Sequence, residues 1–181
     1  MILPIITAPH PVLSSIAKRV EKIDAPLTRT IDDMKETLAR TKDPVGVGLA
    51  APQVGKSLQL FIVRENPKRP FSVFINPHIT LIHADLKADS HRSNPRKSNQ
   101  KSAKIKSASK KLEGCLSLNV IWGEVKRNST VIATYLDEKG AQHTKTFTGF
   151  FAIVIQHEYD HLQGILFPRR VLEQKGKLYK S

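Results

Sequence analysis

An apolar run, residues 150–155, leads directly into the pattern His157-Glu158-Tyr159-Asp160-His161, and this feature constrains the fold more than any other. The β-branched residues of the run suit a strand, but its length and the polar motif that follows favour a buried helix over residues 149–163. Gly164 is the expected end of that helix. Because residues four positions apart share one face of a helix, the two imidazoles are expected to point the same way.

The remainder of the chain reads mainly as β-strands. Helical spacing of apolar residues recurs over residues 27–40, and Pro44 and Gly46 are expected to end that helix. The runs with strand character are 58–63, 71–75, 79–82, 120–125, 130–136 and 144–147. We therefore predict an α+β fold, in which antiparallel strands pack around a central helix that carries the H-E-x-x-H motif.

Length and charge indicate one domain with a basic insertion. The 181 residues suit a single domain. Lys and Arg number 29 against 16 Asp and Glu, and residues 84–112 alone contribute +7 to the formal charge of +13. That stretch contains no aromatic residue, which is typical of a solvated loop. We expect one domain over residues 1–181, with a flexible basic insertion at about 84–112.

The composition excludes several classes of protein. Cys115 is the one cysteine, so a secreted disulfide scaffold is ruled out. The longest apolar runs fall far short of the ~20 residues of a bilayer-spanning helix, so no membrane association is expected. The first ten residues lack the basic leader, apolar stretch and cleavage site of a signal peptide, and a cytoplasmic protein is the expectation.

The H-E-x-x-H pattern is typical of a site for a divalent metal ion. His157 and His161 can bind one ion, and Glu158 can reach a water at that ion as general base. The competing interpretation is a solvated helix face with incidental histidines. That interpretation is weakened because burying unpaired His and Glu beside so apolar a run would be costly.

A catalytic ion of this kind usually has three protein ligands. Two protease patterns lack the third one here, because Phe167 takes the place of the last metzincin histidine and Glu173 alone follows His161 as a candidate glutamate. Cys115, within Glu113-Gly114-Cys115-Leu116-Ser117, offers a thiolate, which is a strong ligand for Fe(II) or Zn(II). A buried, inert cysteine is the alternative interpretation.

Three segments together resemble the signature motifs of the peptide deformylase family, in that family's order. They are Gly46-Val47-Gly48-Leu49-Ala50-Ala51-Pro52-Gln53, Glu113-Gly114-Cys115-Leu116-Ser117 and Gln156-His157-Glu158-Tyr159-Asp160-His161. The resemblance implies a hydrolase that removes the N-terminal formyl group from formylmethionyl peptides of nascent proteins and releases formate. It also implies one divalent ion, Fe(II) natively with Zn(II), Ni(II) or Co(II) as possible substitutes, held by Cys115, His157 and His161.

The same resemblance assigns roles to individual residues. Glu158 would take a proton from the attacking water and pass it to the leaving amine. The Gln53 side-chain amide and the Leu116 backbone N–H would stabilise negative charge on the formyl oxygen. Gly48 would let the substrate backbone approach closely. With Leu116, the side chains that would line the methionine pocket are Val47, Ile153 and Val154, for which plain core positions are the alternative.

Residues beside the motifs have weaker assignments. Asp160 and Gln156 are candidates to orient a ligand histidine, with exposed helix positions as the alternative. Glu113 and Arg127 are candidates for an ion pair near the metal loop. The chain also departs from the family at three positions. Asn119 stands where the family usually has proline, and Arg169 stands where an acidic residue is common. Trp122 stands where a common member has an arginine that can contact the distal part of the substrate. Peptide preference beyond the first residue therefore stays open.

The basic segment bears on partners and on alternative functions. Residues 87–111 would hold the enzyme near the ribosome through rRNA contact and counterion release, the alternative being a solvated linker without a partner. For the whole chain, a zinc-type metallopeptidase and a basic RNA-binding module are the alternatives. The RNA-binding module is disfavoured because residues 84–112 lack the aromatic side chains of stacking platforms.

Overall fold

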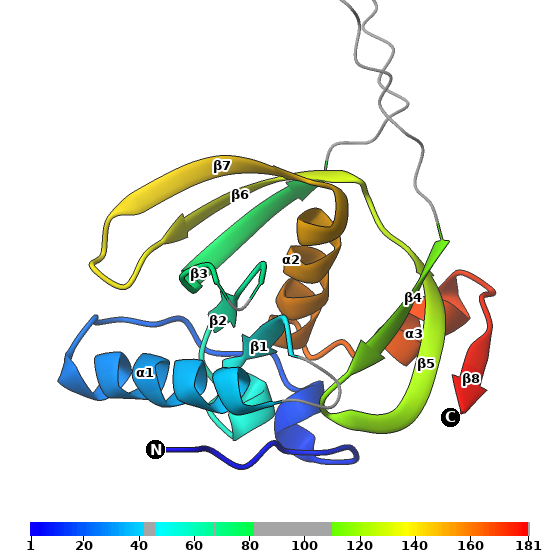
Figure 1. Ribbon diagram of the computed structural model, residues 1–181, viewed down its shortest axis with the longest axis horizontal. Helices are drawn as coiled ribbons and strands as arrows, with labels where there is room; N and C mark the ends of the chain where they lie inside the picture. Colours follow the sequence, from blue (N-terminus) through cyan, green and yellow to red (C-terminus); the bar gives the residue numbers. More distant parts are fainter. Residues whose placement is uncertain (42–45, 67, 82–109, 181) are drawn as a thin grey trace, which may run out of the picture.

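The computed structural model describes residues 1–41, 46–66, 68–81 and 110–180, which form two antiparallel sheets and three α-helices (Figure 1). The larger sheet has the order β1 (Gly48–Ala50), β2 (Leu60–Val63), β3 (Ser72–Leu81), β6 (Thr130–Leu136), β7 (Gln142–Thr148). The smaller has the order β4 (Lys110–Cys115), β5 (Leu118–Lys126), β8 (Leu178–Lys180). The helices are α1 (Ala25–Arg40), α2 (Gly149–Leu162) and α3 (Phe167–Glu173), and the 3-10 turns are η1 (Pro11–Ser14) and η2 (Ala51–Val54). The predicted α+β class with antiparallel strands is confirmed.

The helix predicted over residues 149–163 is present as α2, which ends one residue earlier. In Figure 1 it lies between the larger sheet and the β4–β5 hairpin. Its apolar residues pack into the same core as Phe61, Phe74 and Tyr135 of the larger sheet. The Phe74 ring lies 4.6 Å from that of Phe61 and 4.1 Å from that of Tyr135, measured between centroids. Burial of this face supplies the hydrophobic free energy that holds α2 against the sheet.

The first predicted helix, 27–40, begins two residues earlier as α1. Asp24 caps it, since its side chain accepts a hydrogen bond of 3.0 Å from the Leu27 backbone N–H. Pro26 in the first turn suits a position where no intrahelical donor is needed. The buried face has the predicted helical spacing: Leu27, Ile31, Met34 and Leu38. Pro44, one of its predicted stop signals, lies outside the described residues.

One continuous strand replaces two predicted ones. The runs 71–75 and 79–82 were expected as separate strands, but β3 extends from Ser72 to Leu81, and residue 82 lies outside the described residues. The pairing with β6 shifts between Ile75 and His78, next to Asn76, whose φ is +49°. The Asn76 side chain accepts from the Val20 N–H and donates to its carbonyl, both at 2.9 Å. The bulge accommodates Asn76 and Pro77, so one strand continues through the Asn-Pro sequence that was expected to end it.

The glycine-framed segment, expected to be neither helix nor ordinary strand, forms β1 and then η2. The predicted strand 58–63 appears as β2 (Leu60–Val63). The remaining predicted strands, 120–125, 130–136 and 144–147, correspond to β5, β6 and β7.

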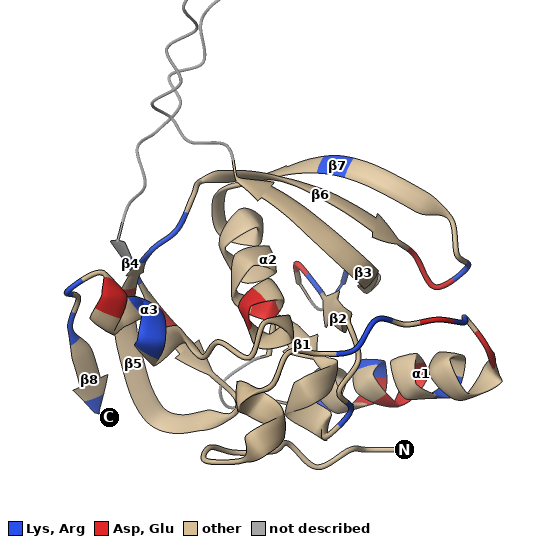
Figure 2. Cartoon of the chain, turned by 180° about the vertical axis from the view of Figure 1, so that it is seen from behind, with Lys and Arg blue, Asp and Glu red and all other residues tan. Residues whose placement is uncertain are grey.

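The smaller sheet corrects one predicted boundary. Most of the basic insertion expected at 84–112 lies outside the described residues, but residues 110–112 belong to β4 and pair with β5. β4, β8 and α3 were not predicted. In Figure 2, β3 and β6 are tan along nearly their whole length, whereas α1 and α3 carry charged segments. The strands β3 and β6 thus carry no charged side chain, whereas β7 of the same sheet carries Lys145.

Of the helices in the described ranges, none has the length and apolar character to span a membrane.

Candidate metal centre

Three potential ligand side chains meet where the end of β4 approaches α2. The ligand atoms of Cys115, His157 and His161 all lie within 4.8 Å of one another. The Cys115 sulfur is 3.3 Å from His161 Nε2. A register shift in the β4–β5 pairing between Glu113 and Cys115 accompanies the arrival of the sulfur at this point, as bulges often re-aim a side chain. The two imidazoles come from successive turns of α2, as the i, i+4 spacing predicts.

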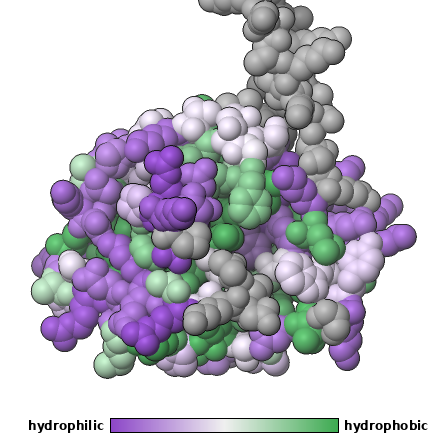
Figure 3. Space-filling view, viewed as in Figure 1, coloured by the Kyte–Doolittle hydropathy of each residue, from purple (hydrophilic) through white to green (hydrophobic). Residues whose placement is uncertain are grey.

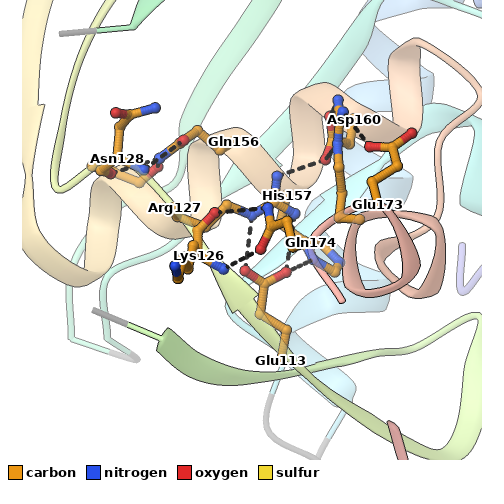
Figure 4. Close-up of polar contacts among 11 residues, drawn as sticks. Glu113, Lys126, Arg127, Asn128, Gln156, His157, Asp160, Glu173 and Gln174 are labelled. Carbon is orange, nitrogen blue, oxygen red and sulfur yellow. Dashed lines mark hydrogen bonds and ion pairs between the residues drawn. The ribbon is translucent and has the colours of Figure 1, made fainter. Parts of the chain in front are cut away.

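A buried carboxylate orients His157. His157 Nδ1 donates to Glu113 Oε2 over 3.0 Å, so Nε2 is the nitrogen that faces Cys115 and would bind a metal ion. Arg127 holds Glu113 with two hydrogen bonds, from Nε at 2.9 Å and from an Nη atom at 3.0 Å (Figure 4). Burial alone raises the pKa of Glu113, but hydrogen bonds from His157 and Arg127 outweigh it and lower the pKa to about 2. Glu113 is therefore ionised.

The predicted ion pair between Glu113 and Arg127 is thus present. Asp160 and Gln156, the two residues predicted to orient a ligand histidine, have other hydrogen-bond partners. Asp160 accepts from Arg127 at 2.6 Å and from Arg170. Gln156 bonds the Asn128 backbone, accepting from its N–H at 3.1 Å and donating to its carbonyl at 2.8 Å. Neither side chain has a described hydrogen bond to a histidine. The orienting role therefore falls to Glu113, through a contact between β4 and α2.

Glu158 is buried, with 4% of its surface exposed, and its Oε2 has no hydrogen-bond partner among the described residues. Burial raises the pKa of Glu158 to about 7. A Cβ atom at position 48 would lie 2.3 Å from Glu158 Oε1, which is closer than real contacts allow. Gly48 therefore makes room for this carboxylate, a function that its sequence context did not indicate.

Gln53 lies beside the same cluster and is 2% exposed. Its side-chain oxygen accepts from the Ala50 N–H at 2.8 Å, which fixes the amide orientation. The Nε2 group then donates toward Ser117 Oγ at 3.3 Å and the Cys115 sulfur at 3.4 Å. The amide N–H groups of Gln53 are therefore directed at the candidate metal site.

A cavity of about 210 Å³ opens onto the cluster. It is lined by Cys115, His157, Glu158 and Gln53, and also by all five residues expected to contact the substrate side chain or backbone: Val47, Gly48, Leu116, Ile153 and Val154. Three further apolar lining residues were not singled out as pocket residues: Leu112, Trp122 and Phe150. Figure 3 shows apolar side chains gathered on this face between the larger sheet and β4.

The donor set suits a divalent transition metal. One thiolate and two imidazoles are ligands that Zn(II) and Fe(II) both accept, and three protein ligands leave a position open. Burial lowers the pKa of His161 well below its usual value, so its imidazole is neutral, the form that binds metal. Burial also lowers the pKa of His157, but hydrogen bonds with Cys115 and Glu113 outweigh it and raise the pKa. Uptake of a cation would therefore displace a proton from His157.

A Cys/His/His cluster next to a buried carboxylate and an apolar cavity is the arrangement expected of a metal-dependent hydrolase, here one whose H-E-x-x-H helix is completed by a cysteine. Comparison with known proteins is more specific. The polypeptide deformylase family model matches residues 2–177, and the chain belongs to that family.

Individual relatives agree with this assignment. A peptide deformylase of Pseudothermotoga lettingae is 36% identical over 159 residues, which cover 87% of this chain and 75% of that protein. The crystal structure of the Thermotoga maritima peptide deformylase matches with a TM-score of 0.74 and 32% identity, covering 94% of this chain and 97% of that one. A peptide deformylase structure from Synechococcus elongatus gives a TM-score of 0.72 and 34% identity, covering 93% and 78%.

Proposed function

We propose that this chain, a hydrolase of the deformylase family, removes the formyl group from N-formylmethionyl nascent peptides at the cluster of Cys115, His157, His161 and Glu158. Family membership over residues 2–177 supports the reaction. The convergence of the three ligand atoms within 4.8 Å carries the assignment of the site. In this proposal α2 is the central helix of the fold, and cytoplasmic action follows from the nascent-chain substrate.

Cys115, His157 and His161 would hold one divalent ion, Fe(II) natively, with Zn(II), Ni(II) or Co(II) able to replace it. When bound, such an ion supplies Lewis acidity that activates water and polarises a carbonyl. The protein contributes the fixed donor geometry. Glu113 holds the His157 ring by its Nδ1–H, so Nε2 is presented in one orientation.

Glu158 would move the proton of the reaction. Water attacks the formyl carbon, and a carboxylate oxygen of Glu158 accepts the proton that this water loses. As the C–N bond breaks, Glu158 gives the proton to the departing amine, so the products are formate and a free N-terminal methionine. Burial, which raises the pKa of Glu158 to about 7, makes proton transfer in both directions feasible near neutral pH.

Gln53 and the Leu116 backbone N–H would stabilise charge on the formyl oxygen. The Gln53 amide is oriented before substrate arrives, because its oxygen is held by the Ala50 N–H. Donors that need no reorganisation are the effective ones, and losing one typically costs ~10²–10³ in rate. The contacts of Gln53 Nε2 with Cys115 and Ser117 support this role, because Cys115 is one of the proposed metal ligands.

The substrate would bind as an extended strand with its methionine side chain in the apolar cavity. β1 and β4 are edge strands of their sheets, and residues of both line the cavity. An edge strand offers unpaired backbone groups to an incoming peptide. Val47, Leu116, Ile153 and Val154 supply an apolar lining for the methionine.

The proposed contact with the ribosome through residues 87–111 stays a prediction, since all but the last two of them lie outside the described residues. The metallopeptidase and RNA-binding alternatives gain no support from the geometry or from the comparisons.

The test is formate release from formyl-Met-Ala-Ser by protein purified without oxygen, with metal content measured in parallel. Glu158→Gln should keep its metal and lose about 10²–10⁴ in kcat. Glu36→Gln, on the exposed side of α1, is the control and should match the parent protein. Full activity of Glu158→Gln would refute the assignment of the base, and absence of bound metal from the parent protein would refute the site.

A further inference from the structure

We propose that Arg170, on α3, is a positioning residue for the metal centre. It would act through three buried charged groups, Asp160, Arg127 and Glu113, the last of which contacts His157. The inference rests on the proposed metal site and concerns how firmly that site is held. Arg170 lies in the C-terminal part of the chain, outside all three sequence motifs.

Arg170 donates two hydrogen bonds to the carboxylate of Asp160 in α2. Its Nε donates to Asp160 Oδ2 at 3.0 Å, and an Nη atom donates to Oδ1 at 2.7 Å. Paired contacts of this kind fix both distance and orientation of the carboxylate. Asp160 is 4% exposed and the Arg170 side chain 31%, so the contact joins a partly exposed cation to a buried carboxylate.

From Asp160 the contacts continue without a break to the proposed ligand (Figure 4). Asp160 Oδ2 also accepts from Arg127 at 2.6 Å, and Arg127 in turn donates to both oxygens of Glu113. Glu113 then accepts from His157 Nδ1. Arg127 and Glu113 are each 7% exposed, so the middle of the line is shielded from water.

The charges along this line balance. Two cations, Arg127 and Arg170, alternate with two anions, Glu113 and Asp160. Without Arg170, Asp160 would keep Arg127 as its remaining described partner, and Arg127 would serve two buried carboxylates alone. An uncompensated buried charge is costly, so Arg127 would move toward Asp160 and hold Glu113 less firmly. His157 would then lose part of the constraint on its ring.

Arg169 provides a matched control on the same helix. Both arginines contact Glu173, Arg169 at 3.0 Å and Arg170 at 3.1 Å. Only Arg170 has a described contact with Asp160, and the Arg169 side chain is 66% exposed. Removing either cation changes the net charge equally, so a difference between the two variants isolates the link to Asp160.

The experiment measures metal loss to an excess of chelator from Co(II)-loaded full-length protein, alongside thermal unfolding. Substitutions of groups that support a metal ligand typically change metal affinity by about 10–100-fold, and we expect Arg170→Met to speed release about tenfold. Arg169→Met should release metal at the parent rate. Arg170→Lys keeps the charge and loses the paired geometry, so its rate of metal release should lie between those of Arg170→Met and the parent protein. If Arg170→Met does not fold, Arg170→Lys is the variant that tests the proposal.

Release at the parent rate from folded Arg170→Met or Arg170→Lys would overturn the proposal. Equal acceleration in Arg169→Met and Arg170→Met would overturn it as well, since net charge would then explain the effect. A parent protein that takes up no Co(II) refutes the metal site itself, which is a separate result from failure of the Arg170 link.

Discussion

His157 Nδ1 lies 3.0 Å from Glu113 Oε2, although the two residues are 44 positions apart in the chain. This contact joins the proposed ligand helix to the strand that carries the proposed thiolate ligand two residues after Glu113. The same carboxylate is held by Arg127. The structure thus couples ligand geometry to the stability of a buried ion pair.

Glu113→Gln should weaken both properties. It leaves Arg127 buried without its full counter-charge, which should cost about 3–5 kcal/mol in unfolding free energy, and it loosens His157, which should lower metal affinity about 10–100-fold. Urea denaturation and metal content after dialysis check the two effects. Glu36→Gln, as control, removes only partly exposed ion pairs with the N-terminus and Arg40 and should change the unfolding free energy by less than about 1 kcal/mol. Parent-like metal retention in Glu113→Gln would contradict the orienting role.

Gly48→Ala should reduce hydrolysis without removing the metal. The added methyl group would meet Glu158 Oε1 at 2.3 Å and displace the proposed base. We expect kcat to fall by about 10²-fold or more, in the range of a lost acid–base group, while metal content stays at the parent level. Gly149→Ala is the comparison, because its Cβ meets nothing within 4 Å and its φ of +62° adds backbone strain alone. That variant should lose stability and keep its rate.

Cys115→Ser should lose the metal from a folded protein. A neutral hydroxyl is a far weaker ligand for Fe(II) or Zn(II) than a thiolate, and the sulfur lies at the end of β4, where its replacement leaves the β4–β5 pairing intact. Metal analysis after gel filtration, with circular dichroism to verify the fold, measures the change. Full metal occupancy in this variant would show that Cys115 is not a ligand.

Trp122→Arg should alter which peptides are preferred. The Trp122 ring lies over Gly114, where an added Cβ would come within 2.7 Å of it, and lines the cavity as an apolar surface. We expect the parent enzyme to favour formyl-Met-Leu over formyl-Met-Glu. An arginine here should shift the kcat/KM ratio toward the acidic peptide by about two- to fivefold, as for an exposed ion pair. Tyr179→Arg adds the same charge on the neighbouring strand, outside the cavity, and should leave the ratio unchanged.

Short-range patterns in the sequence predicted the two long helices well. The apolar run of α2 and the spacing of Leu27, Ile31, Met34 and Leu38 in α1 are local signals, since each follows from 3.6 residues per turn. β3 was wrongly divided because Asn76-Pro77 normally ends a strand, and the bulge that accommodates it depends on a bond to distant Val20. β8 and α3 carry weak local patterns and form through pairing with β5 and packing against it.

The sequence by itself determined which groups are available for the chemistry: one thiol, two imidazoles four residues apart, and a glutamate next to the first of them. Only the tertiary structure decided how these groups are supported. It assigned the orientation of His157 to Glu113 rather than to Asp160 or Gln156, and it placed Gly48 against Glu158. The physical reason is that helical spacing is encoded within a few residues. The contacts that orient the site depend on how β4, α2 and α3 pack, and no local pattern specifies that packing.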